Sequence, residues 1–249
     1  MKHLSISLSS QKGLVRPHNE DMLLVCTETY RDAEAQREVD ITETSSVIMA
    51  VADGMGGHNA GEVASEDAAR ELGNHISVMS RVLSQRELRE ELEQWIQDEH
   101  TYLTEQGEEN PAQQGMGTTL VAVLCYRERF YAINCGDSRL YLMHDGSLRQ
   151  LSRDHSLYAV THRESDRHII TNCLGGGGDE SFIDYDDITD ELQPGDRLLL
   201  CSDGLTDMVS DEDLEQLLAD PQTMAADFIN AAYQAGGEDN VSVIVITAT

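Results

Sequence analysis

Apolar residues along this chain recur with two different periods. Short runs that are continuously apolar, or that alternate with polar residues, predict β-strands. These runs lie at both ends and in the middle of the sequence, and they cover residues 4–8, 22–25, 47–52, 119–125, 129–135, 139–143, 197–201 and 241–246. The turn Tyr126-Arg127-Glu128 separates two of them, which predicts a hairpin.

Longer stretches repeat their apolar residues every three or four positions, which is typical of amphipathic helices. Helices are predicted for residues 60–79, 86–103, 211–219 and 222–235. Because the strands are clustered and do not alternate strictly with helices, this order favours an α+β fold with mostly antiparallel sheets. The acidic run from Glu87 to Glu99 is expected to be a solvated helix face.

Two stretches show neither period clearly. Residues 30–45 are acidic and polar and are predicted to form a loop. Residues 154–178 are rich in histidine and arginine and end in four glycines, which suggests a mobile segment over a site. The sequence has no internal repeat and no proline-rich linker, so residues 1–249 are expected to form a single domain.

The charge balance excludes several kinds of partner. Forty-six Asp and Glu against seventeen Lys and Arg give a net charge of −29, which repels nucleic acids and anionic membrane surfaces. No apolar run approaches the roughly 20 residues that cross a bilayer. The five cysteines include no CxxC pair, which favours free thiols and a cytoplasmic location. A monomer is expected.

Three aspartates stand at the ends of predicted strands. Asp53 is followed by Gly54 after residues 47–52, Asp203 by a glycine after residues 197–201, and Asp239 precedes the last strand. An Asp-Gly pair is usually only a turn, and Asp145-Gly146 is read that way. Because the Asp at a strand end recurs three times, these carboxylates are expected to converge, and they would repel one another without a cation between them. Their oxygen atoms are suitable ligands for Mg²⁺ or Mn²⁺.

A cation precedes two further carboxylates near the N-terminus. Arg16 lies four and five residues before Glu20 and Asp21. Arginine binds phosphate oxygens through two parallel hydrogen bonds, so Arg16 is a candidate phosphate ligand. The alternative interpretation is an exposed ion pair.

Seven short segments carry a resemblance to a known family. They are Arg16-x-x-Asn19-Glu20-Asp21, Ala52-Asp53-Gly54-Met55-Gly56-Gly57, Gly117-Thr118-Thr119, Asn134-Cys135-Gly136-Asp137-Ser138-Arg139, Asp154-His155-Ser156, Cys201-Ser202-Asp203-Gly204-Leu205 and Glu238-Asp239-Asn240-Val241-Ser242. In this order and spacing they are similar to the motifs of the metal-dependent Ser/Thr protein phosphatases of type 2C (PPM), in their bacterial branch. The resemblance implies a four-layer αββα sandwich with two central antiparallel β-sheets flanked by helices.

The resemblance also implies a centre of two Mn²⁺ or Mg²⁺ ions. Asp53 would bridge both ions, Asp203 and Asp239 would complete the ligands of one, and the carbonyl of Gly54 would bind the other. Arg16 would hold the phosphate. Together these residues would hydrolyse phosphoserine and phosphothreonine with water activated between the ions, without a covalent enzyme intermediate.

Further acidic residues have more distant roles in this family. Glu20 would contact a metal ion through a bound water molecule, and Asp21 would contact the residues that bind the ions without binding an ion itself. Asp137 with Asp203 would bind a weaker third ion. The expected substrates are phosphorylated proteins, and the enzyme is expected to oppose a bacterial Ser/Thr kinase.

The chain departs from the family pattern at two places. Met55 stands where eukaryotic relatives often have a histidine that is thought to protonate the leaving group, and His58 follows three residues later. The segment that covers the site, residues 155–178, is shorter than in many bacterial relatives. The general acid is therefore left open.

Other functions remain as alternatives. A phosphatase acting on a small metabolite or on an anti-sigma-type regulatory protein would have the same motifs. A catalytically weak or inactive module of the same fold would be expected to lack metal ligands, yet Asp53, Asp203 and Asp239 are all present. A nuclease is disfavoured by the negative charge, and Cys173 lacks the Cys-x5-Arg loop of a cysteine phosphatase.

Overall fold

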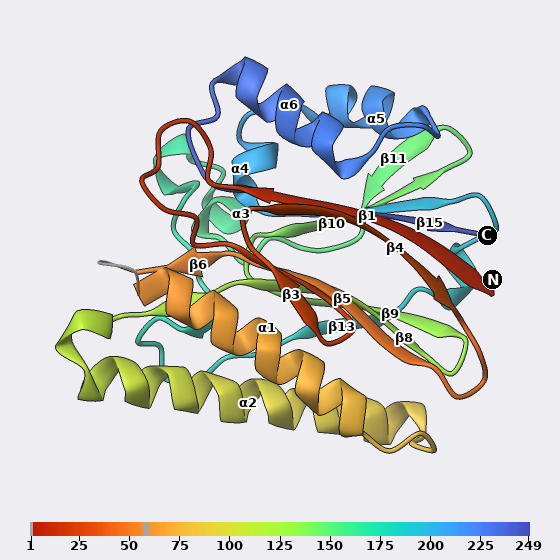
Figure 1. Ribbon diagram of the computed structural model, residues 1–249. Helices are drawn as coiled ribbons and strands as arrows, with labels where there is room; N and C mark the ends of the chain where they lie inside the picture. Colours follow the sequence, from red (N-terminus) through yellow and green to blue (C-terminus); the bar gives the residue numbers. More distant parts are fainter. Residues whose placement is uncertain (1, 57–59) are drawn as a thin grey trace.

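Two six-stranded antiparallel sheets lie face to face, and helices cover the outer face of each (Figure 1). The computed structural model describes residues 2–56 and 60–249. The first sheet has the order β11-β10-β14-β15-β1-β4. Its strands are β1 (His3–Gln11), β4 (Ala33–Asp40), β10 (Arg139–His144), β11 (Ser147–Gln150), β14 (Arg197–Cys201) and β15 (Val241–Ala248).

The second sheet has the order β13-β9-β8-β5-β2-β3. Its strands are β2 (Met22–Val25), β3 (Glu28–Tyr30), β5 (Ser46–Ala52), β8 (Leu120–Tyr126), β9 (Arg129–Cys135) and β13 (Asp184–Asp187). The predicted hairpin is confirmed, because β8 and β9 pair with each other around the turn at residues 127 and 128.

Two pairs of helices form the outer layers. Helices α1 (Ala60–Val78) and α2 (Gln85–Glu109) cover the second sheet, and α5 (Asp211–Ala219) and α6 (Ala225–Ala235) cover the first (Figure 1). The short helices are α3 (Leu157–Thr161) and α4 (Asp203–Thr206), with the 3₁₀ turns η1 (Pro111–Gln113), η2 (Glu164–Asp166) and η3 (Thr189–Glu191). None of the helices in the described part of the chain is long and apolar enough to span a membrane.

Buried apolar side chains form three separate clusters, one between each pair of adjacent layers. The first joins α1 and α2 to the second sheet, the next fills the space between the sheets, and the last joins the first sheet to α5 and α6. All five cysteines are free thiols. The predicted αββα sandwich is confirmed by this arrangement.

Helix α2 begins at a boundary that the sequence specifies. Ser84 and Glu87 form a capping box, in which the Ser84 hydroxyl accepts from the Glu87 N–H and the Glu87 carboxylate accepts from the Ser84 N–H. The expectation of a solvated acidic face is wrong at Glu99, which is 6% exposed. Its Oε1 has no hydrogen-bond partner, and burial raises the pKa of Glu99 to about 7.

A third, small sheet connects distant parts of the chain. Its strands β6 (Gly54–Met55), β7 (Gly117–Thr118) and β12 (Leu174–Gly175) pair in the order β12-β7-β6. His100 on α2 holds one edge of it, since its Nδ1 accepts from the Gly175 N–H at 3.1 Å. Its Nε2 then carries the hydrogen and donates to the Gly178 carbonyl at 3.2 Å. The sheet therefore links α2 to the Asp53-Gly54 loop.

The prediction of a loop over residues 30–45 is wrong, because β4 occupies Ala33–Asp40 and pairs with β1 along its whole length. Strand β4 is at the edge of its sheet, where most of its side chains reach solvent. Its apolar positions are therefore few. The segment 154–178 contains α3, η2 and β12.

Candidate active site

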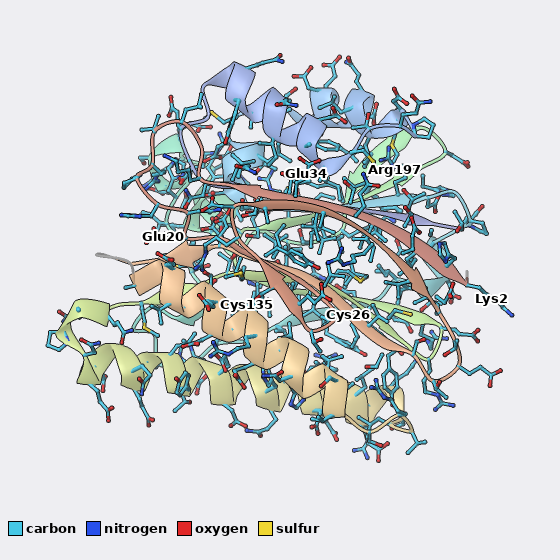
Figure 2. The ribbon with its side chains drawn as sticks, in the orientation of Figure 1. Lys2, Glu20, Cys26, Glu34, Cys135 and Arg197 are labelled. Carbon is cyan, nitrogen blue, oxygen red and sulfur yellow. The ribbon has the colours of Figure 1, made fainter. Side chains whose placement is uncertain are left out.

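One end of the sandwich gathers the aspartates that follow or precede the central strands. Asp53 follows β5, Asp203 follows β14 as the first residue of α4, and Asp239 precedes β15. Figure 2 shows Glu20 at this end of the sandwich and Lys2 at the opposite end. The three strand-end aspartates come from both sheets, and they lie close enough together that the charges of Asp203 and Asp239 raise the pKa of Asp53.

Burial and mutual repulsion define the electrostatics of this group. Burial, followed by the negative charges of Asp21 and Asp203, raises the pKa of Asp53 well above its usual range. Burial is also the main cause that raises the pKa of Asp21 to about 7 and that of Asp203 to about 6. Carboxylates that raise one another's pKa in this way would be relieved by a cation between them.

The donor set fits divalent cations. Carboxylate and carbonyl oxygens predominate, and these are the ligands of Mg²⁺ and Mn²⁺. Asp21 is completely buried, with Oδ2 accepting from the Ser202 hydroxyl at 2.8 Å and Oδ1 without a partner. Such an unpaired buried carboxylate oxygen is unfavourable unless positive charge lies nearby.

The backbone around Asp53 is fixed by two neighbouring threonines. The Asp53 N–H donates to Thr119 Oγ1 at 3.1 Å, and the Asp53 carbonyl accepts from Thr118 Oγ1 and the Thr119 N–H, each at 2.9 Å. Thr118 therefore positions the main chain of Asp53.

Glycine is required after Asp53 for reasons of space. A Cβ on Gly54 would lie 2.1 Å from the carbonyl oxygen of Gly61, in the first turn of α1. The same applies at Gly204, where a Cβ would lie 1.9 Å from the carbonyl oxygen of Asn240. Each Asp-Gly pair thus lets another segment approach the loop that carries the aspartate.

Arg16 lies against Asp239. Its Nη2 donates to Asp239 Oδ2 at 2.6 Å, and the Arg16 side chain is 51% exposed. The loop that carries Arg16 is held on both sides by Asn240, whose Nδ2 donates to the carbonyls of Lys12 and His18 at 2.9 and 2.8 Å. Asn240 Oδ1 also accepts from the Glu20 N–H at 2.8 Å. Asn240 therefore connects the loop that contains Arg16 with the segment that contains Asp239.

Glu20 and Asp137 are two further carboxylates near the central aspartates. Burial raises the pKa of Glu20, and the neighbouring Asp239 raises it further, while Arg16 lowers it. Asp137 is 9% exposed, and burial together with the charge of Asp203 raises its pKa to about 7. Glu20 and Asp137, both predicted from the sequence, therefore lie close to the strand-end aspartates.

Two residues near Asp203 had not been singled out in the sequence. Asp207 lies one helical turn after Asp203, and its Oδ2 is 3.5 Å from Nδ1 of His168. The Asp-x-x-x-Asp spacing is a signal for a shared helix face once the helix is known. Met55 lies in β6, paired with Gly117. His58 and Gly57 lie outside the described residues.

Comparison with known proteins decides the family. A model of the family described as protein phosphatase 2C matches residues 29–237. The chain belongs to the protein phosphatase 2C family. It is an enzyme, a metal-dependent phosphoprotein phosphatase of the bacterial type, and the resemblance seen in its motifs is confirmed.

Several members of the protein phosphatase 2C family are similar to this chain over almost its whole length. The serine/threonine phosphatase stp of Listeria monocytogenes is 35% identical over 248 residues, which are 95% of this chain and 93% of that protein. The solved serine/threonine phosphatase of S. agalactiae has a TM-score of 0.84 at 28% identity, covering 99% of this chain and 100% of that one.

A further solved structure contains metal. The catalytic domain of the serine/threonine protein phosphatase PstP, in complex with two manganese ions, has a TM-score of 0.77 at 33% identity. The match covers 99% of each chain. A 2C-family fold very similar to this one thus holds two ions.

Proposed function

We propose that this chain removes phosphate from phosphoserine and phosphothreonine residues of proteins, and that it does so as one catalytic domain with two divalent cations. Asp53, Asp203 and Asp239 would hold the ions with the Gly54 carbonyl. The observation that carries the proposal is the convergence of these mutually repelling carboxylates from two sheets.

When bound, two divalent cations supply a water of lowered pKa and neutralise charge on the phosphoryl group. The other tasks belong to the chain itself. Arg16 is half exposed and lies within 2.6 Å of Asp239, so it can exchange this ion pair for the phosphate oxygens of a substrate. Asn240 positions Arg16 by anchoring the loop that carries it.

Glu20 and Asp21 support the ligands in different ways. Asp21 accepts a hydrogen bond from Ser202, the residue before Asp203, and thereby orients the turn into α4. Glu20 is half-buried beside Arg16 and Asp239, where it would hold water at the edge of the site. Asp137 would contribute to a weaker third position.

The relatives suggest the substrate class and the ions. The Listeria protein is named as a serine/threonine phosphatase, and the PstP structure holds manganese. We propose Mn²⁺ or Mg²⁺ for this chain, with phosphoproteins as substrates and a bacterial Ser/Thr kinase as the opposing enzyme. The net charge of −29 is consistent with proteins as substrates, because it disfavours nucleic acids.

The test uses two Asp-Gly pairs of the same chain. Asp203→Asn removes a charged ligand and should abolish Mn²⁺-dependent release of phosphate from p-nitrophenyl phosphate and from a phosphothreonine peptide. The control is Asp145→Asn, which changes the exposed turn between β10 and β11 at a left-handed φ of 48° that asparagine tolerates. Metal-dependent activity that survives in Asp203→Asn would refute the proposal.

A further inference from the structure

The loop between β1 and β2 presents two apolar side chains directly beside Arg16. Leu14 is 61% exposed and Val15 is 67% exposed. An isolated exposed apolar residue is normal on a protein surface. Here two such residues are adjacent, and they precede the residue assigned to the phosphate. A substrate that reaches Arg16 therefore has to pass close to both of them.

The backbone of this loop is fixed against the turn that leads into β15. The Leu14 N–H donates to the Gly237 carbonyl at 2.8 Å. A Cβ on Gly13 would lie 2.1 Å from the Asp239 carbonyl oxygen, so the two segments are in direct contact. Together with the hydrogen bonds from Asn240 to both sides of the loop, these contacts preorganise Leu14 and Val15. Little conformational entropy is then lost when a ligand binds to them.

The distance from Arg16 limits which part of a substrate can touch these side chains. Arg16 donates to Asp239 at 2.6 Å, while Leu14, two residues earlier, is bonded to Gly237. Two residues of chain span at most about 7 Å. The residues next to a phosphorylated side chain lie within the same distance of it. A polypeptide whose phosphate is held by Arg16 can therefore place its neighbouring side chains over Leu14 and Val15.

The charge of the loop also suits a phosphorylated segment. Residues 11–18 include Lys12, Arg16 and His18 but no acidic residue, in a chain that has 46 Asp and Glu. A phosphate ester carries between one and two negative charges at neutral pH. This loop attracts such a group, whereas the net charge of −29 repels it from much of the remaining surface.

We propose that Leu14 and Val15 form a docking surface for the substrate polypeptide and select aliphatic side chains next to the phosphorylated residue. The occupant is the short segment of a phosphoprotein on either side of its phosphoserine or phosphothreonine. The inference rests on the proposed function, because it names the kind of segment that the same site accepts.

The test compares two phosphothreonine peptides that differ only in the residues on both sides of the phosphothreonine. These residues are valine in one peptide and alanine in the other, so the two peptides carry equal charge. With Mn²⁺, wild-type protein should have a kcat/KM about 3- to 10-fold higher for the valine peptide, as expected when an aliphatic side chain is partly buried. The ratio of the two values is the readout, because damage to the metal centre lowers both values together.

Two variants and a matched control make the assignment specific. Val15→Ser and Leu14→Ala should each lower the ratio at least about 2-fold, because each removes apolar contact area. The control Val82→Ser changes a valine that is 78% exposed and follows α1. The 19 residues of α1 are about 28 Å long, and its first turn lies against Gly54, so Val82 is remote from the site. This variant should keep the wild-type ratio.

The outcomes separate the docking surface from the proposed function. Equal kcat/KM values for both peptides in wild-type protein would overturn the docking surface, as would a ratio that neither Val15→Ser nor Leu14→Ala changes. Mn²⁺-dependent hydrolysis of both peptides would support the proposed function in either case. A ratio lost only in Val160→Ser, at an exposed valine of α3, would move the selection to the segment over the site and refute the assignment to Leu14 and Val15. If neither peptide were hydrolysed, the proposed function would fail together with the inference that rests on it.

Discussion

Glu99 is a carboxyl group that the fold buries without a partner, and its replacement tests the electrostatic reasoning away from the metal site. The side chain is 6% exposed, between α2 and α1, and its Oε1 accepts no hydrogen bond. Burial, with smaller contributions from the negative charges of Asp67 and Glu71, raises the pKa of Glu99 from 4.5 to about 7. Glu99→Gln keeps the shape and removes the charge.

The sign follows from linkage between protonation and folding. Below about pH 4.5 both the folded and the unfolded chain carry the proton, and Glu99 favours neither state. Between about pH 4.5 and 7 the unfolded chain releases this proton first, so wild-type stability falls as the pH rises. Above pH 7 the loss is complete and amounts to at most about 3 kcal/mol, at 1.36 kcal/mol for each pKa unit.

The assay is urea unfolding of metal-free protein at pH 5 and pH 8. Glu99→Gln should exceed the wild-type free energy of unfolding by less than about 1 kcal/mol at pH 5 and by up to about 3 kcal/mol at pH 8. In a chain of this size that gain corresponds to a rise in melting temperature of about 6–12 °C. Glu105→Gln, an exposed position of the same helix, should change stability by less than about 0.5 kcal/mol. A gain at pH 8 that is absent, or equal at both pH values, would refute this reasoning.

Three other predictions concern the active site. Arg16→Ala should raise the KM for phosphopeptides about 10- to 100-fold, as expected for loss of charged hydrogen bonds to phosphate; unchanged steady-state kinetics would contradict its assigned contact. Mn²⁺ binding should become stronger from pH 5 to pH 8 and should release protons, because the pKa of Asp203 in the metal-free protein is about 6. Calorimetry in buffers of different ionisation enthalpy measures the number of protons released per bound ion. A count of zero would contradict the prediction. Gly61→Ala should destabilise the protein by more than about 2 kcal/mol, because its Cβ would lie 2.6 Å from the carbonyl carbon of the residue after Asp53. The control Gly178→Ala has no atom nearer than 3.8 Å, and equal melting temperatures for the two variants would contradict the steric argument.

The strands predicted with correct bounds share one physical property. Met22–Val25, Arg129–Cys135 and Arg197–Cys201 lie inside their sheets, and nearly every residue in them is buried. A strand covered on both faces is continuously apolar, and the sequence shows it directly. The edge strand β4 was missed because its solvent-facing residues are charged, and only its pairing with β1 makes it a strand.

The site was predictable to the extent that strand ends and family motifs specify it. Asp53, Asp203 and Asp239 were marked by their position next to apolar strands, and the structure brings them together. The contact between His168 and Asp207 joins residues 39 positions apart. It depends on how the segment after α3 folds back over α4, which no local pattern indicates. The burial of Glu99 depends in the same way on the packing of α2 against α1.

The last strand of the chain lies in the interior of the first sheet. Strand β15 forms hydrogen bonds with β1 on one side and β14 on the other. During synthesis on the ribosome, β1 emerges long before β15, so its inner edge stays unpaired until β15 follows, and Asp239 arrives only just before β15. Nascent chains should therefore expose an unpaired apolar strand until β15 has been synthesised, which makes them candidates for chaperone binding. Phosphatase activity would then begin only after residues 241–248 have left the ribosome and β15 has paired with β1 and β14.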